Sequence, residues 1–118
     1  MTRTFALSPT KKQLTLIGLV RRAQKAAIGH VRNGIKTCDV DKTARKIISH
    51  AGYAKFSPHG TGHGVGMEIH ELPSLAPDSK DILRERMIIT VEPGIYVPQV
   101  GGARWEDMML VTKRECKL

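Results

Sequence analysis

The feature that most constrains the fold is a single change of hydrophobic periodicity, near Gly52, from helical spacing to short strand-like runs. Before this point, apolar residues recur every three or four positions and predict helices over 9–28 and 39–50. Ser8 followed by Pro9 is expected to start the first helix, and Gly52 to end the second. The expected buried positions are Leu16, Ile17, Val20, Ala23 and Ala27 in the first helix and Val40, Ala44, Ile47, Ile48 and Ala51 in the second.

The segments outside the two helices read as strands and their connections. Strands are expected over 2–7, 65–71, 87–91 and 103–112, with a loop over 73–79 and a hairpin connection over 98–102. The order of these elements is one strand, two helices and then consecutive strands. This order predicts an α+β domain whose two helices cover one face of a mainly antiparallel sheet. A chain of 118 residues has room for one such domain.

The charge balance raises the question of a nucleic-acid partner. Nineteen Lys and Arg against eleven Asp and Glu give a net charge of +8. Most of these cations fall in the two expected helices and no aromatic side chains interleave with them, so a solvated basic face is favoured over a nucleic-acid-binding domain. Cys38 and Cys116 lack the close spacing of a cysteine zinc site or a disulfide framework.

No segment of the sequence predicts a membrane helix. The longest uncharged apolar stretch, 14–20, falls well short of the roughly 20 residues that span a bilayer. Residues 1–7 lack the apolar core of a secretory signal. We therefore expect a cytoplasmic protein.

Histidine and glycine are concentrated in the segment 59–71, where His59, His63 and His70 are three of the five histidines of the chain. The alternating glycines argue against a helix, which excludes the paired histidines of a helical zinc protease. The same glycines do not have the spacing of a phosphate-binding loop. In a regular strand His63 and His70 would face opposite sides, unless a glycine kink or bulge intervenes.

Two glutamates stand at positions where a carboxylate needs a partner. Glu92 ends an apolar strand, and burial of its charge requires an arginine, a set of N–H donors or a metal. Glu106 alternates with Arg104, Met108 and Leu110, where a core residue is expected. Imidazole plus carboxylates without thiolate suits Mn, Co, Fe or Zn. Each residue also has a structural explanation without a metal. The histidine would be hydrogen-bonded to the backbone, Glu92 would form an ion pair with Arg104, and Glu106 would be a carboxylate at a strand edge.

Three segments, 61–71, 90–96 and 104–107, resemble signature segments of the pita-bread (creatinase/aminopeptidase-like) metallopeptidases. That family contains Xaa-Pro dipeptidases (prolidases), aminopeptidases P and methionine aminopeptidases. The proline-specific branch is most similar, through His59 and the run Glu92-Pro93-Gly94-Ile95-Tyr96, and the likeness covers essentially all 118 residues. The resemblance implies a pita-bread domain and hydrolysis of an N-terminal peptide bond before proline by metal-activated water.

The resemblance also implies the site residues. His63, Glu92 and Glu106 would be metal ligands, with Glu106 bridging two ions in the complete family site and Mn²⁺ the expected metal ahead of Co, Zn or Fe. His70 would hydrogen-bond the scissile carbonyl or the oxyanion, and His59 would shape the substrate end of the site. Arg104 would orient Glu106 or a substrate carboxylate.

This sequence departs from the family in one respect, because it lacks two aspartate metal ligands. In the family, the second of these aspartates comes immediately before the strand that Met1–Phe5 resembles. Asp39, Asp41, Asp78 and Asp81 lie in helix or loop contexts that do not match them. Residues 1–118 are therefore expected to form a partial catalytic domain that holds at most one ion. A homo-oligomer or a complementing chain is a further expectation, and a catalytically inactive pita-bread binding module is the alternative.

Overall fold

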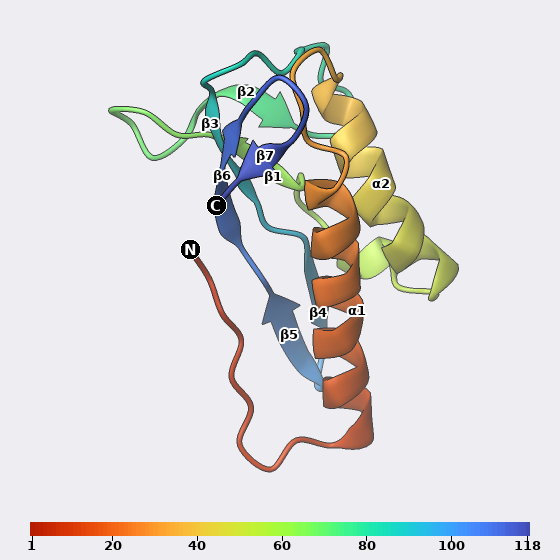
Figure 1. Cartoon of the computed structure of the whole chain (residues 1–118). Helices are drawn as coiled ribbons and strands as arrows, with labels where there is room; N and C mark the ends of the chain where they lie inside the picture. The colour runs from red at the N-terminus through yellow and green to blue at the C-terminus, as the bar shows by residue number, and fades with distance from the viewer.

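The computed structural model describes all 118 residues as two helices packed on one face of an antiparallel sheet (Figure 1). The helices are α1 (Lys11–Ile28) and α2 (Thr37–His50), followed by the 3₁₀ turn η1 (Ala54–Phe56). The strands are β1 (Gly62–Gly64), β2 (Glu71–Leu75), β3 (Ile88–Val91), β4 (Gly94–Val97), β5 (Gly101–Arg104), β6 (Asp107–Val111) and β7 (Cys116–Lys117). The predicted α+β architecture is confirmed. Neither helix is both long enough and apolar enough to cross a lipid bilayer.

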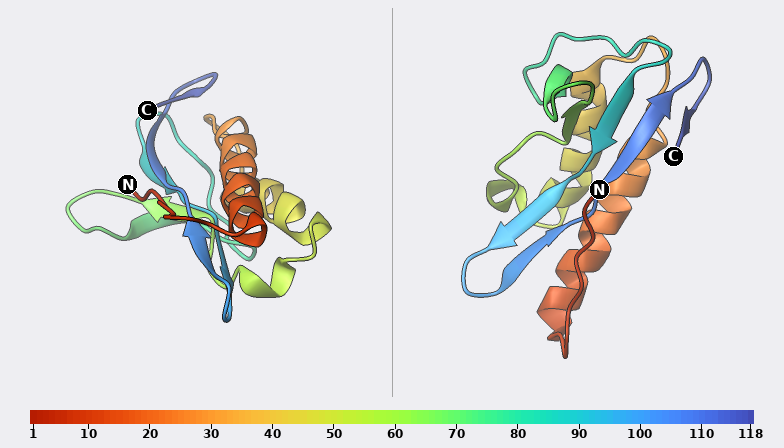
Figure 2. Two further views of the ribbon diagram at one scale, coloured as in Figure 1. Left: turned by 90° about the horizontal axis from the view of Figure 1, so that it is seen from below. Right: turned by 90° about the vertical axis from the view of Figure 1, so that its left-hand side faces the viewer.

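The sheet has two parts. Five strands pair in the order β2-β1-β3-β6-β7, and β4 and β5 pair as a separate hairpin. Every pairing is antiparallel. The right-hand view of Figure 2 shows the β4–β5 hairpin running on from β3 and β6 alongside α1. Residues 92–93 and 105–106, between these strands, therefore lie next to each other in the sheet, which places Glu92 and Glu106 on neighbouring chain segments.

The helix boundaries follow from their caps. α1 starts after Thr10, whose hydroxyl accepts from the Gln13 N–H at 3.3 Å while the Gln13 side chain accepts from the Thr10 N–H at 2.8 Å. The predicted start at Ser8 and Pro9 is wrong, because this capping box satisfies two helix-end groups together. The predicted end of α2 at Gly52 is confirmed: Gly52 has φ +83° and its N–H donates to the Ser49 carbonyl at 2.9 Å.

Several predicted strands are wrong. Residues 65–70 form an exposed loop between β1 and β2, because the Glu71 carboxylate and the Glu68 carbonyl accept hydrogen bonds from within that loop. Accordingly, part of the predicted loop at 73–79 is strand β2. The predicted strand at 2–7 reduces to one bridge between Thr2 and Glu106, since the Thr4 hydroxyl bonds the Arg104 backbone in place of a ladder. The predicted strand at 103–112 is divided into β5 and β6.

The hydrophobic core lies between the helices and the sheet. From β6 it contains Met109 and Val111, whereas Met108 and Leu110 are 48% and 41% exposed on the opposite face. The prediction that Glu106 occupies a core position is therefore wrong, because its face of β6 points away from the helices. The fully buried side chains with the largest volumes are Leu16, Leu19, Ile48, Leu75, Leu83, Ile89, Ile95, Val20, Val31, Val40, Val91 and Val111.

Neighbouring isoleucines on β3 test this assignment of faces. Ile89 is fully buried, while Ile88 is 46% exposed. Ile89→Val is expected to lower the free energy of unfolding by about 0.5–1.5 kcal/mol, because it leaves a small cavity, and Ile88→Val by less than about 0.5 kcal/mol. Urea denaturation of both variants measures the difference, and an equal cost for the two would contradict the assignment.

Candidate metal site

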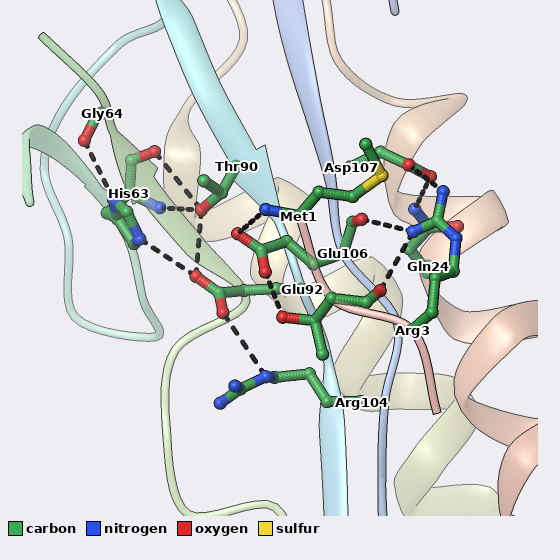
Figure 3. A network of polar contacts seen from close by, with 11 residues as sticks. Met1, Arg3, Gln24, His63, Gly64, Thr90, Glu92, Arg104, Glu106 and Asp107 are labelled. Atoms are coloured by element: carbon green, nitrogen blue, oxygen red, sulfur yellow. Dashed lines mark hydrogen bonds and ion pairs between the residues drawn. The ribbon is translucent and has the colours of Figure 1, made fainter. Parts of the chain in front are cut away.

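The site is built around a contact between β1 and the end of β3. His63 Nε2 lies 3.0 Å from Glu92 Oε1, with both side chains mostly buried. Figure 3 shows the two side chains pointing toward one another across the sheet. The Thr90 hydroxyl donates to the same Glu92 oxygen at 3.0 Å. The predicted pair of His63 and Glu92 is thus brought together, on the sheet face opposite the helices.

The hydrogen bonds of His63 show that this pair fits a cation. His63 Nδ1 lies 2.9 Å from the Gly64 carbonyl, which can only accept, so Nδ1 carries a proton. A neutral His63 therefore directs its Nε2 lone pair at the Glu92 carboxylate, and two acceptors face each other unless a proton or a metal ion lies between them. A ring N–H given to a backbone carbonyl is also the usual arrangement of a metal-ligating histidine. The donor chemistry therefore suits a divalent metal.

Glu106 lies beside this pair but makes other contacts. Its Oε2 accepts a hydrogen bond from the Thr2 hydroxyl, and its Oε1 is 3.4 Å from the Met1 ammonium group. Figure 3 shows the carboxylate turned toward Met1. The structure contains no group of three His, Cys, Asp or Glu side chains close enough to hold a metal as they stand. Glu106 would have to turn toward Glu92 to complete the predicted ligand set.

The residue after Glu106 anchors this strand to α1 and to the N-terminal segment. Asp107 is buried, and its carboxylate accepts from Arg3 Nη2 at 2.5 Å and from Gln24 Nε2 at 2.6 Å. Arg3 also donates to the Glu106 carbonyl at 2.6 Å. Hydrogen bonds from Arg3 therefore fix the backbone of Glu106, while its carboxylate lies on the sheet face that carries His63 and Glu92.

His70 is placed beside His63 despite their distance in sequence. The register of β1 against β2 shifts between His63 and Gly64, which is the irregularity that the glycine run predicts. The two imidazole rings have centroids 4.3 Å apart. His70 is exposed, so its ring can reach a bound ligand from the solvent side.

Arg104 approaches the second oxygen of Glu92, and His59 contacts the β4–β5 hairpin. Arg104 Nε is 3.9 Å from Glu92 Oε2, and the Arg104 side chain is 43% exposed. Arg104 therefore contacts Glu92 rather than Glu106, at a distance where solvent screens much of the attraction. His59 precedes β1 in the chain, and its Nε2 lies 2.8 Å from the hydroxyl of Tyr96 on β4.

Tyr96 is a site residue to which the sequence analysis gave no role. His59 Nδ1 lies 2.8 Å from the Gly60 carbonyl, so Nδ1 donates and the remaining nitrogen, Nε2, accepts from the Tyr96 hydroxyl. A side chain at Gly94 would fall 2.5 Å from that hydroxyl and 2.8 Å from His59 Nε2. Gly94 therefore makes room for the His59–Tyr96 pair, which the spacing of 37 residues does not reveal.

The Tyr96 hydroxyl gives a measurable prediction. Tyr96→Phe is expected to lower the free energy of unfolding by about 0.5–1.5 kcal/mol, because His59 Nε2 loses its donor. Urea denaturation measures the change. Tyr53→Phe is the matched control, because the Tyr53 hydroxyl makes no hydrogen bond and its ring packs on Phe56. An equal effect of both substitutions would contradict the role of the hydroxyl.

A buried ion pair on α2, also missed from the sequence, fixes the backbone before the site. Asp41 is 1% exposed and accepts from Arg45 Nε and Nη2 at 2.8 and 2.9 Å. Asp41 Oδ1 also accepts from the N–H and hydroxyl of Thr61, at 3.1 and 2.8 Å. Arg45 donates to the carbonyls of Ser57 and His59, at 3.1 and 3.0 Å. We call Asp41, Arg45 and Thr61 the α2 clamp; the i, i+4 spacing of Asp41 and Arg45 is its signal in the sequence.

The α2 clamp connects directly to the candidate ligands. The Thr61 carbonyl accepts from the Glu92 N–H at 2.7 Å. His63, in β1, follows Thr61 by two residues. The hydrogen bond with Asp41 raises the pKa of Arg45 above its ordinary value, although burial opposes this effect. The clamp therefore holds the backbone of both Glu92 and His63 relative to α2.

Comparison with known proteins gives the family. The sequence model of metallopeptidase family M24 matches residues 1–113. The chain is 44% identical over 118 residues to an Xaa-Pro dipeptidase of Pyrococcus horikoshii, an alignment that covers 99% of this chain and 34% of that protein. It is 46% identical over 114 residues to the putative dipeptidase YkvY of Bacillus subtilis, with 96% of this chain and 31% of that protein covered.

Solved structures agree with the sequence matches. The prolidase from Pyrococcus horikoshii OT3 superposes with a TM-score of 0.95 at 44% identity, covering 98% of this chain and 33% of that one. An X-Pro aminopeptidase from Thermotoga maritima MSB8 has a TM-score of 0.89 at 32% identity, covering 93% and 31%. The chain thus spans about a third of the length of the relatives it matches. The predicted resemblance to the prolidase branch of the pita-bread enzymes is confirmed, and the chain belongs to metallopeptidase family M24.

Proposed function

We propose that this chain carries part of the active site of a metal-dependent Xaa-Pro peptidase, which hydrolyses an N-terminal peptide bond before proline. The observation that carries the proposal is the contact of His63 Nε2 with Glu92 Oε1 in a chain of family M24. Relatives named Xaa-Pro dipeptidase and prolidase support proline at the second position of the substrate.

His63, Glu92 and Glu106 are the proposed metal ligands. His63 would use Nε2, because its Nδ1 proton is given to Gly64. Glu92 would offer Oε2 as well as Oε1, because its nearest partner, Arg104, is 3.9 Å away. Three protein ligands are the usual number for one catalytic ion, and we propose Mn²⁺ ahead of Co, Zn or Fe. A divalent cation bound there supplies a Lewis acid that polarises the amide carbonyl and lowers the pKa of water.

The remaining side chains would bind and orient the substrate. His70, exposed beside His63, is proposed to hydrogen-bond the carbonyl oxygen of the scissile bond. His59 has both ring nitrogens bonded within the chain, so it would shape the proline end of the site by the bulk of its ring. Arg104, partly exposed next to Glu92, is proposed to attract a carboxylate of the substrate.

The alternative is a catalytically inactive binding module of the same family. The observation that favours it is Glu106, whose carboxylate contacts Met1 and Thr2 instead of approaching Glu92. If the chain is instead an incomplete peptidase, a complementing chain or a second copy would supply further ligands. These assembly states and the cytoplasmic location stay predictions.

Hydrolysis of an Xaa-Pro dipeptide by the purified chain tests the proposal. Turnover is expected only with added Mn²⁺, and a Glu92→Ala variant purified in parallel is expected to show none. Turnover that persists in the Glu92→Ala variant or without added metal would show that neither Glu92 nor the metal is required, which would contradict the proposal. No turnover from either protein would favour the binding module.

A further inference from the structure

Thr90 lies between the two proposed ligands that are in contact. It is in the middle of β3 and is 2% exposed. Its Oγ1 accepts from the His63 N–H at 3.1 Å and donates to Glu92 Oε1 at 3.0 Å. The His63 carbonyl, at 3.5 Å, is the more distant acceptor for the same hydroxyl proton. One buried hydroxyl therefore contacts the backbone of one ligand and the carboxylate of the other.

The packing of β1 keeps Thr90 in this position. A side chain at Gly62 would fall 2.0 Å from the Thr90 carbonyl oxygen and 3.1 Å from Thr90 Oγ1. Glycine at 62 is therefore required for β1 to approach β3 this closely. The close approach brings the His63 N–H within reach of the hydroxyl, and His63 cannot move along β1 without breaking that bond.

The single proton of Thr90 also fixes one oxygen of Glu92. Oε1 is held between the Thr90 hydroxyl and His63 Nε2, each at 3.0 Å, while the nearest partner of Oε2 is Arg104 at 3.9 Å. The carboxylate is thus fixed through one oxygen and left open at the other. Valine at position 90 would keep the branched shape of the side chain and remove both hydrogen bonds, and serine would keep the hydroxyl.

We propose that Thr90 is a positioning residue that orients His63 and Glu92 together for a divalent cation. The inference rests on the proposed function, because it takes these two residues as ligands. Thr90 itself is not proposed as a ligand of the cation or as a contact of the substrate. Its effect is to hold the His63 imidazole and the Glu92 carboxylate in one arrangement before the metal binds. Residues that hydrogen-bond metal ligands commonly orient the ligands in this way.

Mn²⁺ titration calorimetry on the Thr90→Val and Thr90→Ser variants tests the proposal, with thermal melting to verify folding. Thr90→Val is expected to bind Mn²⁺ about 10- to 100-fold more weakly than the wild-type chain, and Thr90→Ser within about threefold of it. Thr15→Val is the matched control, because the Thr15 hydroxyl bonds only the Lys11 carbonyl within α1.

A metal-free measurement separates this inference from the proposed function. The ring nitrogen NMR signals of His63 are expected to shift in Thr90→Val and to stay unchanged in Thr90→Ser and Thr15→Val. Wild-type affinity and unchanged signals in Thr90→Val would overturn the positioning role and leave the function intact. A wild-type chain that binds no Mn²⁺ would overturn the proposed function, and the shift of the His63 signals would then decide whether Thr90 orders the pair.

Discussion

Arg45→Met is expected to lower the free energy of unfolding by about 3–5 kcal/mol. Asp41 is 1% exposed, and Arg45 is its only positive partner. Methionine keeps most of the apolar stem of Arg45 but leaves the Asp41 carboxylate buried without a counter-charge. It also leaves the carbonyls of Ser57 and His59 without the N–H donors of Arg45. These losses occur together, because the single Arg45 side chain makes all of these contacts.

Urea denaturation measures this effect, and Arg84→Met is the matched control. Arg84 is exposed and forms no ion pair, so its replacement is expected to change stability by less than about 0.5 kcal/mol. A double variant with Asp41→Asn and Arg45→Met is expected to lose less than the sum of the single variants, because the pair acts as a unit. Additive losses, or equal effects of the two arginine substitutions, would show that the α2 clamp does not contribute as described.

Glu92→Gln is expected to weaken Mn²⁺ binding by more than about 100-fold. Replacing a residue that only hydrogen-bonds a metal ligand already weakens metal binding by about 10- to 100-fold, and loss of the ligand's own charge is expected to cost more. Glutamine keeps the shape of the side chain and removes the charge that the cation requires. Glu85→Gln is the matched control, because Glu85 is exposed and its side chain forms no ion pair.

Titration calorimetry measures both variants. Thermal melting verifies that Glu92→Gln folds, which is expected because Thr90 and His63 can still hydrogen-bond the amide. Binding by Glu92→Gln within about threefold of the wild type would exclude Glu92 as a ligand and would move the cation to other residues.

Regular, strongly periodic segments could be predicted from the sequence. Both helices and β3 lie within two residues of the expected boundaries, because one apolar face buried against a single core sets the period of the pattern. The segments around the site could not be predicted in this way. The predicted strand at 65–71 does not form, because the N–H groups of Gly66 and Glu68 bond within the loop. At the N-terminal segment, the Thr4 hydroxyl replaces a backbone ladder.

The candidate ligands could be named from the sequence, but their contacts could not. His63 and Glu92 meet because β1 and β3 pair, a relation between residues 29 positions apart that no local pattern encodes. The glycine run did indicate the irregularity that brings His70 to His63. Thr90 and Tyr96 were part of the recognised segments, yet only the fold shows which side chains their hydroxyls contact.

The identity of the metal ligands can be measured directly by pulsed electron paramagnetic resonance of Mn²⁺ added to the chain. We expect modulation from one coordinated imidazole nitrogen in the wild-type chain and its loss in His63→Ala. His50→Ala is expected to be unchanged, because His50 lies on the exposed end of α2. Nitrogen modulation that persists in His63→Ala, or its absence from the wild-type chain with Mn²⁺ bound, would contradict the assignment of His63 as a ligand.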